Sequence, residues 1–265
     1  MRWLSALVER LKPGNGQNGI GQPMATACEA AERGDYSAAL DIWAPLAHAG
    51  VARAQANIGT CFAEGRGVER DFKLAAQWLS LAAKAGDAVG QRDLAALHFR
   101  GDGVERDHAR AIALYRAAAE QGDGPAQDTL SRTLLEGDGL EPDYAEARRW
   151  AEAAAMQGNA ASMTRLGMIF NNALGVERDT GLAAEWWRKA AAGGDADGQA
   201  MLGAAYHLGA GVQRDAVEAY AWLCRAHRGG SQLAGRFLDA VRRTLSAAEK
   251  AEAERRAAAP LEAMA

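Results

Sequence analysis

Apolar and small residues recur along the middle of the chain with a period of 36 residues. Two columns keep one residue type in every copy: Gly67, Gly103, Gly139, Gly175 and Gly211, and then Asp71, Asp107, Asp143, Asp179 and Asp215. Self-similarity at a fixed period of this length is the signature of a repeat architecture, in which each copy is one supersecondary unit. The sequence therefore predicts five copies of one small unit.

Each copy divides into two helices. In the first copy the apolar stripes with helical spacing are Ile58, Gly59 and Phe62, and then Ala75, Trp78, Leu79 and Ala82. The loop between them, residues 65–70, contains two glycines, which suit a helix C-terminus and positive φ angles. Asp71 then stands where an N-cap belongs, and Gly86 is expected to end the second helix.

Large apolar residues mark both helices of every copy. The second-helix column is Trp78, Leu114, Trp150, Trp186 and Trp222, and the first-helix column is Ile58, Leu94, Leu130, Leu166 and Leu202. Their recurrence favours core packing over a ladder of ligand-stacking rings. Because adjacent helical residues cannot both face one core line, Trp187 is predicted to be the partly exposed member of the Trp186–Trp187 pair.

A single helical hairpin cannot bury its apolar face alone, so neighbouring copies must stack around a continuous core. The composition agrees with this, since 49% of the residues are hydrophobic, with alanine by far the most frequent of them, and only 6% are aromatic. Alanine is the best helix former and a poor strand former. Helices are therefore expected throughout.

The repeat resembles a known family. The loop sequence Gly-Arg-Gly-Val-Glu-Arg-Asp of residues 65–71, with Trp78 and residues 82–86, is similar to the Sel1-like repeat, a relative of the tetratricopeptide repeat. The resemblance implies an all-α fold, a right-handed α-solenoid of stacked helix-turn-helix units. The five copies are assigned to residues 54–89, 90–125, 126–161, 162–197 and 198–230. Three local departures leave this fold intact: Ala173 replaces a loop glycine, Pro142 replaces a loop arginine, and Leu114 replaces a tryptophan.

Three further segments complete the expected domain organisation: residues 1–23, 24–53 and 231–265. Residues 24–53 resemble a degenerate copy that keeps the aspartate, alanine and glycine columns but lacks the loop motif. Residues 1–23 are expected to hold a short amphipathic helix, residues 1–12, and a flexible linker. Beyond the fifth copy, Ser231–Thr244 predicts one more helix, and Ser246–Glu249 is a capping-box signature for a final polar helix that caps the stack.

Charge and cysteine content narrow the function classes. A net charge of −4 argues against a nonspecific grip on nucleic acid, which needs clustered basic residues. The three cysteines lack metal-ligand spacing and suggest neither a disulfide framework nor a zinc site. No apolar run has the length of a membrane-spanning helix, so no integral membrane segment is expected. The bias toward arginine over lysine hints at a bacterial source.

The first residues look briefly like an export signal. However, Glu9 and Arg10 interrupt the apolar stretch of residues 3–8 after six residues, whereas a signal needs about 7 to 15. The expected location is therefore the cytoplasm, and a periplasmic or secreted location is the alternative.

No catalytic, cofactor-binding or metal-ligating residues are predicted. Each aspartate of the repeat stands alone at a helix start, which favours an N-cap over a calcium ladder. The glycine pairs match no phosphate-binding loop, the five histidines are scattered, and no nucleophile motif is present. A non-enzyme is expected, and a hydrolase with a site in a groove is the less favoured alternative.

The partner-binding surface is expected on the first helices, because the resemblance to tetratricopeptide-like solenoids implies that these line the concave face. Residues that vary between copies are the candidates: Arg92, Phe99, Arg100, Arg132, Met168, Asn171, Asn172 and His207. Arg92, Phe99, Arg100 and Arg132 are expected along one wall, where they suit an acidic or extended peptide. The alternative is an ordinary solvated helix face.

The sequence thus favours a non-catalytic scaffold or adaptor that binds a partner protein or peptide. An exported envelope or host-interaction factor is the alternative from a different class. The sequence names neither the partner nor the number of subunits.

Overall fold

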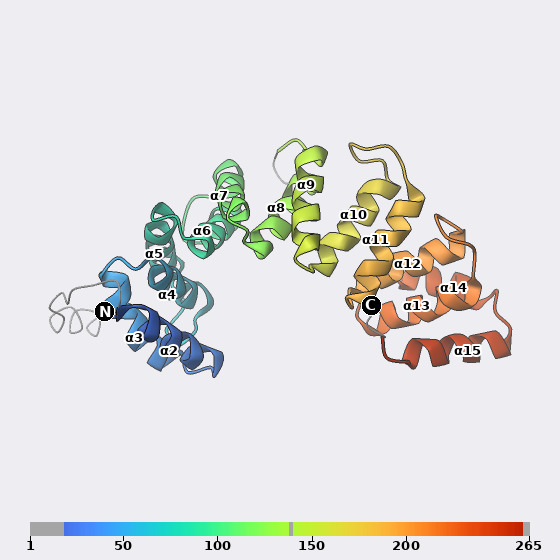
Figure 1. Ribbon diagram of the computed structural model, residues 1–265, viewed down its shortest axis with the longest axis horizontal. Helices are drawn as coiled ribbons and strands as arrows, with labels where there is room; N and C mark the ends of the chain where they lie inside the picture. The colour runs from blue at the N-terminus through green and yellow to red at the C-terminus, as the bar shows by residue number, and fades with distance from the viewer. Residues whose placement is uncertain (1–18, 138–139, 262–265) are drawn as a thin grey trace. The chain divides into compact units, whose positions relative to one another are not determined.

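The computed structural model describes residues 19–137 and 140–261 and contains fourteen α-helices in this part of the chain (Figure 1). The helices are α2 (Gly21–Glu32), α3 (Tyr36–His48), α4 (Ala52–Glu64), α5 (Phe72–Lys84), α6 (Ala88–Arg100), α7 (His108–Glu120), α8 (Gly124–Glu136), α9 (Tyr144–Met156), α10 (Ala160–Asn171), α11 (Thr180–Ala192), α12 (Ala196–Leu208), α13 (Ala216–Arg228), α14 (Gly235–Arg242) and α15 (Ala247–Ala258). The predicted all-α fold is confirmed. The helix expected in residues 1–12 lies outside the described residues.

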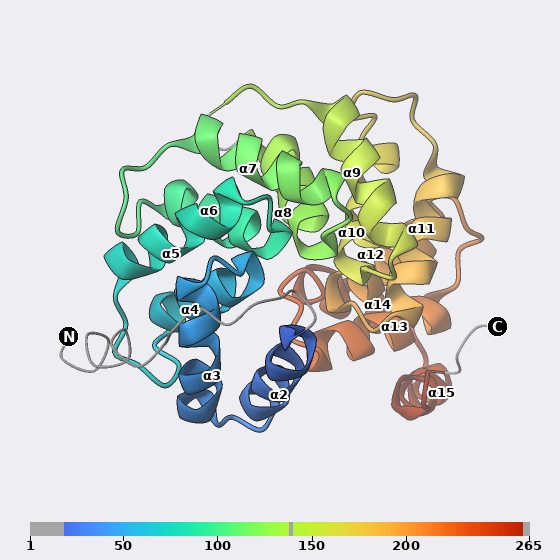
Figure 2. The same ribbon diagram turned by 60° about the vertical axis from the view of Figure 1, so that its left-hand side comes forward.

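Consecutive helices pack as pairs, as the 36-residue pattern predicts. The pairs with the most extensive contacts are α4 with α5, α6 with α7, α10 with α11, and α12 with α13. Helices α2 and α3 form a further pair ahead of the first full copy (Figure 2). The chain divides into two compact units, residues 1–126 and 127–265.

Each unit has its own apolar core, built from the two predicted stripes. Leu79 in the first unit and Leu166, Leu202 and Leu223 in the second are completely buried. Burying one leucine side chain stabilises a fold by about 1.5–3 kcal/mol. Alanines fill the remaining positions between helices, which lets the helix axes approach closely.

The aspartate column caps the second helices, as predicted. Asp71 accepts hydrogen bonds from the backbone N–H groups of Lys73 and Leu74 at 2.9 and 3.0 Å. The side chains at the four later positions of the column also accept backbone N–H bonds of their own helices: Asp107, Asp143, Asp179 and Asp215. Such caps satisfy donors that have no partner within the helix.

The loop glycines are required for two reasons. Gly211 has a φ of +73°, and a Cβ atom there would lie 1.9 Å from the carbonyl oxygen of Thr180 in the preceding helix pair. Gly67 has a φ of +69°, and its Cβ would lie 2.7 Å from Cβ of Tyr36. At Gly67 and Gly211 the loop therefore presses its backbone against the start of the preceding second helix. Ala173 keeps the left-handed conformation without being glycine, with a φ of +57°.

The prediction for the adjacent tryptophans is wrong. Trp187 is only 4% exposed and donates its indole N–H to the carbonyl oxygen of Thr164 at 3.3 Å, whereas Trp186 is half-buried. The core line of the second helices runs through the position of Leu79, one residue after the tryptophan column, and Trp187 occupies that position. Trp186 instead lies at the edge, where the Lys189 ammonium sits 4.3 Å from its ring centre.

The segment after the last copy is less helical than predicted. Helix α14 covers only Gly235–Arg242 of the expected Ser231–Thr244. The Ser231 hydroxyl donates to Asp197 at 2.6 Å and accepts the N–H of Leu233 at 3.2 Å, and this local bonding competes with helix formation. The capping box at Ser246 and Glu249 is confirmed, and α15 packs on α13.

Candidate functional site

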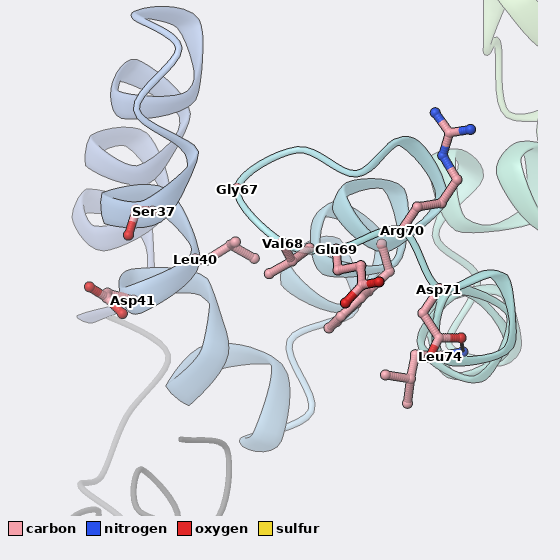
Figure 3. A pocket seen from close by; sticks show the side chains of 10 residues that line it. Ser37, Leu40, Asp41, Gly67, Val68, Glu69, Arg70, Asp71 and Leu74 are labelled. Atoms are coloured by element: carbon pink, nitrogen blue, oxygen red, sulfur yellow. Dashed lines mark hydrogen bonds between the residues drawn. The ribbon is translucent and has the colours of Figure 1, made fainter. Parts of the chain in front are cut away.

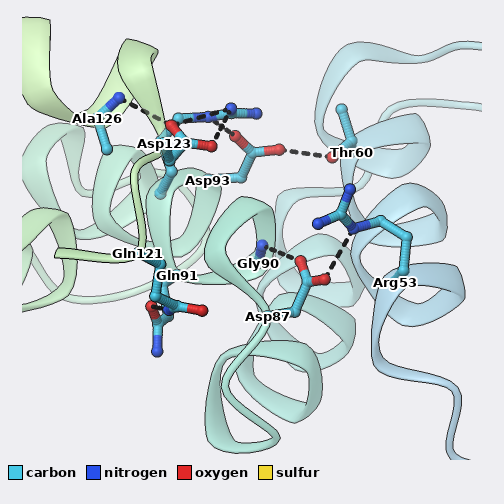
Figure 4. Close-up of polar contacts among 10 residues, drawn as sticks. Arg53, Thr60, Asp87, Gly90, Gln91, Asp93, Gln121, Asp123 and Ala126 are labelled. Carbon is cyan, nitrogen blue, oxygen red and sulfur yellow. Dashed lines mark hydrogen bonds and ion pairs between the residues drawn. The ribbon is translucent and has the colours of Figure 1, made fainter. Parts of the chain in front are cut away.

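A second column of polar residues joins neighbouring helix pairs through the first helices. Asp87, which precedes α6, accepts the N–H of Gly90 at 2.8 Å and so caps its own helix. The same carboxylate accepts Nε of Arg53 from the preceding pair at 2.7 Å (Figure 4). One side chain thus starts a helix and bonds it to the previous unit of the stack.

Asp123 repeats this arrangement one period later. It accepts the N–H of Ala126 at 2.8 Å and Nη1 of Arg92 at 3.0 Å. Arg92 also donates through Nε to Asp93 at 2.9 Å, and Asp93 in turn accepts the hydroxyl of Thr60 at 2.6 Å (Figure 4). Burial disfavours the charged form of Arg92, but the two carboxylates outweigh this and raise its pKa.

The second unit contains equivalent bridges. Asp195 accepts the N–H of Gly198 at 2.7 Å and the hydroxyl of Thr164 at 2.6 Å. Asp128 accepts Nη1 of the largely buried Arg165 at 2.9 Å. Polar side chains of the first helices therefore hold successive pairs together in both units.

Sequence reasoning missed this bridging column. Its signal was present, because a residue with a short polar side chain follows the helix-ending glycine in five copies: Asp87, Asp123, Asn159, Asp195 and Ser231. The capping role of the column could have been predicted from that pattern. The arginine and threonine partners come from helices more than 30 residues away and become apparent only in the folded chain.

The predicted binding arginines are all engaged in ion pairs. Arg92 is held by two carboxylates, Arg100 pairs with Asp102 at 2.6 Å, and Arg132 pairs with Glu136 at 3.0 Å. Their charges are thus balanced by neighbours on the same surface. Arg92 and Arg100 belong to the first unit and Arg132 to the second, so their placement on one continuous wall stays a prediction.

The other predicted site residues lie on or directly after first helices and are half-buried or exposed. Phe99 packs against the ring of His108 in an edge-to-face contact, with ring centres 4.8 Å apart. Met168 is half-buried on α10, and Asn171 donates to the exposed Asn172 at 2.8 Å. His207 is half-buried near the end of α12. Their role in binding stays a prediction.

Two cavities in the first unit could receive a ligand group. The larger, about 730 Å³, lies between α3 and the loop and helix that follow α4 (Figure 3). Ser37 and Asp41 form one side, and Asp71 and Leu74 lie on the other (Figure 3). Asp71 is already used as a helix cap. Apart from Phe62 on α4, the helical residues of its lining belong to the second helices α3 and α5.

The smaller cavity, about 300 Å³, opens among the first helices α2, α4 and α6. Arg92 and Asp93 of α6 line it together with Asn57 and Thr60 of α4 and Glu32 of α2. It draws its lining from three successive helix pairs and contains one of the residues that the sequence singled out. We therefore treat it as the candidate site.

The thiol that lines this cavity is poorly reactive. Burial raises the pKa of the Cys61 thiol to about 11, so this lining residue is protonated at neutral pH and is a poor nucleophile. Among the described residues, no three His, Cys, Asp or Glu side chains are grouped to hold a metal ion. No helix in the described ranges has the length and apolar character needed to cross a bilayer.

Comparisons with known proteins agree with the helix-pair architecture. The Sel1 repeat family matches five consecutive segments, residues 52–87, 88–123, 125–159, 160–195 and 196–231. Among curated proteins, none matches the chain in sequence.

Two crystal structures are similar over most of the chain. A Sel1 repeat protein from Oxalobacter formigenes is 30% identical with a TM-score of 0.71, and the match covers 84% of this chain and 100% of that one. A protective antigen present in uropathogenic Escherichia coli strains, which displays an SLR fold, is 29% identical with a TM-score of 0.78. That match covers 96% of this chain and 56% of the antigen chain.

Proposed function

Because the chain belongs to the Sel1 repeat family, we propose that it is a non-catalytic scaffold that binds a partner protein or peptide through the face of its first helices. The observation that carries the proposal is the cavity among α2, α4 and α6, which is lined by three successive helix pairs. Solenoid proteins use extended surfaces of this kind, to which several repeats contribute side chains. A ligand seated there contacts more than one repeat at once.

Two matched double variants in the second unit test the proposal. Arg132→Glu with Met168→Glu changes the first-helix face, whereas Arg149→Glu with Met156→Glu makes the same chemical changes on the second helix α9. The side chains of Arg132 and Arg149 are each 43% or more exposed, and each lies within ion-pair distance of a glutamate on its own helix. The charge change and the residue types are thus the same in both variants. However, Met168 is half-buried whereas Met156 is 85% exposed, so the first-helix variant must first be shown to fold.

The experiment is affinity capture from the native cell followed by mass spectrometry, with circular dichroism as the folding control. The scaffold proposal expects a partner that is recovered with the wild type and the α9 variant and is lost with the first-helix variant. Equal recovery with both variants would contradict the first-helix face. Robust enzymatic turnover, abolished by a point change in the cavity, would contradict the non-catalytic role.

The proposal includes a cytoplasmic location, which the free cysteines Cys28, Cys61 and Cys224 support, because thiols persist in a reducing compartment. The similarity to a protective antigen favours a second candidate, an exported factor that meets a host or the cell envelope. Cell fractionation with intact-mass measurement separates the two. Full-length protein in the soluble cytoplasmic fraction supports the first candidate, and protein recovered outside the cytoplasm supports the second.

A further inference from the structure

Most polar groups around the smaller cavity, the candidate site, already form hydrogen bonds or ion pairs within the fold. Thr60 and Arg92 both bond to Asp93. Arg66 donates through Nη1 to the hydroxyl of Tyr36 at 3.0 Å, and its Nε lies 2.5 Å from a carboxylate oxygen of Glu64. These groups shape the wall of the cavity and leave little bonding capacity for a ligand.

The indole N–H of Trp43 is the first exception. Trp43 lines the cavity and is only 4% exposed, yet its Nε1 has no hydrogen-bond partner among the described residues. Trp187 occupies the same repeat position four periods later and does donate, to the carbonyl oxygen of Thr164. Leaving a buried donor unsatisfied costs about 1–3 kcal/mol. Trp43 thus contributes a buried donor without an acceptor to the surroundings of the cavity.

Two further lining groups are unused. The side-chain amide of Asn57, half-buried on α4, makes no hydrogen bond within the described part of the chain. Glu32, at the end of α2, is exposed and forms no ion pair with any described residue. The unused groups of the lining are thus one buried donor, one half-buried amide and one exposed carboxylate.

The charged side chains that line the cavity indicate which charge a ligand group should carry. The lining cations Arg66 and Arg92 each lie against carboxylates, Glu64 for the former and Asp93 with Asp123 for the latter. Glu32 adds a negative charge that no described cation neutralises. A cationic ligand group is therefore favoured and a carboxylate is disfavoured, which differs from the acidic peptide that the sequence allowed.

We propose that this cavity binds an extended peptide segment that carries a lysine or arginine side chain. A backbone carbonyl of the segment accepts the Trp43 indole N–H, a neighbouring peptide group pairs with the amide of Asn57, and the cationic side chain meets Glu32. A volume of about 300 Å³ is at the lower end for ligand pockets and suits a short segment. The inference deepens the proposed function and rests on it.

The test follows tryptophan indole N–H resonances of the 15N-labelled full chain by NMR. The chain has seven tryptophans, and the Trp43 resonance is assigned by its disappearance in Trp43→Phe. The probes are two blocked pentapeptides, alanines around a central lysine or a central glutamate. The lysine peptide at millimolar concentration is expected to shift the Trp43 resonance and leave that of Trp187 in place. The glutamate peptide is expected to bind at least several-fold more weakly.

Two matched variants test the contacts. Glu32→Gln is expected to weaken binding of the lysine peptide by roughly two- to five-fold, as for the loss of an exposed ion pair. Glu29→Gln, on the same helix and outside the cavity, is expected to leave the affinity unchanged. Asn57→Ala is expected to weaken both peptides by roughly two- to ten-fold. Because Asn57 makes no described hydrogen bond, this variant keeps the test valid even where Trp43→Phe disturbs packing.

A Trp43 resonance that the lysine peptide does not move, or equal binding of both peptides, would overturn the inference. That result leaves the proposed function standing if the first-helix variant in the second unit still loses its partner. If the lysine peptide does not shift the Trp43 resonance and partner recovery is also unaffected by the first-helix variant, both proposals fail. The two failures are thus distinguishable.

Discussion

The guanidinium of Arg92 and the carboxylate of Asp123 lie 3.0 Å apart, and that carboxylate also caps the helix that begins at Gly124. The contact joins one helix pair to the start of the next. A varying position of the repeat thus has a structural task, and variation between copies alone does not identify a ligand contact. Arg92 is therefore a poor choice for a binding test.

Removal of the bridging carboxylate is expected to destabilise the fold more than removal of a simple cap. Asp123→Ala leaves the half-buried Arg92 without one of its partners and deletes a cap, for an expected loss of about 2–3 kcal/mol. Asp107→Ala deletes a cap on Arg110 N–H alone and should cost about 1 kcal/mol. Urea denaturation followed by circular dichroism measures both, and equal losses would refute the bridging role.

Steric crowding at the loop glycines is expected to make their substitution more destabilising than the positive φ angle alone would. Gly211→Ala places a Cβ atom 1.9 Å from the Thr180 carbonyl oxygen, so we expect a loss above about 3 kcal/mol. Gly194→Ala has a similar φ of +84° with no atom within 4 Å, and should cost only about 0.5–1 kcal/mol, the strain less the entropy of glycine. Thermal unfolding compares the two, and similar melting temperatures would show that backbone strain alone accounts for the column.

Ala173 is expected to be a site where glycine stabilises. It is the only non-glycine residue with a positive φ in the described ranges, at +57°. Ala173→Gly should raise the free energy of unfolding by about 0.5–1 kcal/mol. This is the backbone strain that glycine relieves, minus the larger conformational entropy that glycine loses on folding. The converse change Gly65→Ala, at a φ of +74° with no contact under 3.5 Å, should lower it by a similar amount. Chemical denaturation that shows the same sign for both would contradict this account.

The Cys61 thiol is expected to make stability depend on alkaline pH. Burial raises its pKa from 9.0 to about 11, so between these values the unfolded chain releases a proton that the folded protein retains. Stability from this group is present below pH 9 and falls as the pH rises toward 11, by at most about 2–3 kcal/mol. Urea midpoints at pH 9 and pH 11 should differ less in Cys61→Ala than in the wild type. An unchanged difference would refute the buried-thiol contribution.

Local features of the fold could be predicted from the sequence, because they depend on residues close along the chain. The caps at Asp71 and Ser246 and the loop at Gly65 are of this kind. Which of Trp186 and Trp187 is the more exposed could not be predicted from the sequence, because neighbouring helices determine which face of a helix becomes buried. Here the core line passes through Leu79 and its equivalents.

The candidate site shows the same division. The first helices and the inclusion of Arg92 were predicted, but the ion pairs that neutralise Arg92 depend on Asp93 and on the distant Asp123. The unused groups of Trp43, Asn57 and Glu32 come from three different helices. Their proximity, and with it the preference for a cation, is a property of the stacked chain alone.

The measurement that tests the central claim most directly is the recovery of a partner with the Arg132→Glu, Met168→Glu variant relative to the Arg149→Glu, Met156→Glu variant. The scaffold account predicts that the first-helix variant retains less than about one tenth of the recovery, a loss of roughly 1.4 kcal/mol or more in binding free energy. Equal recovery of the same partner by both folded variants would contradict binding through the first helices.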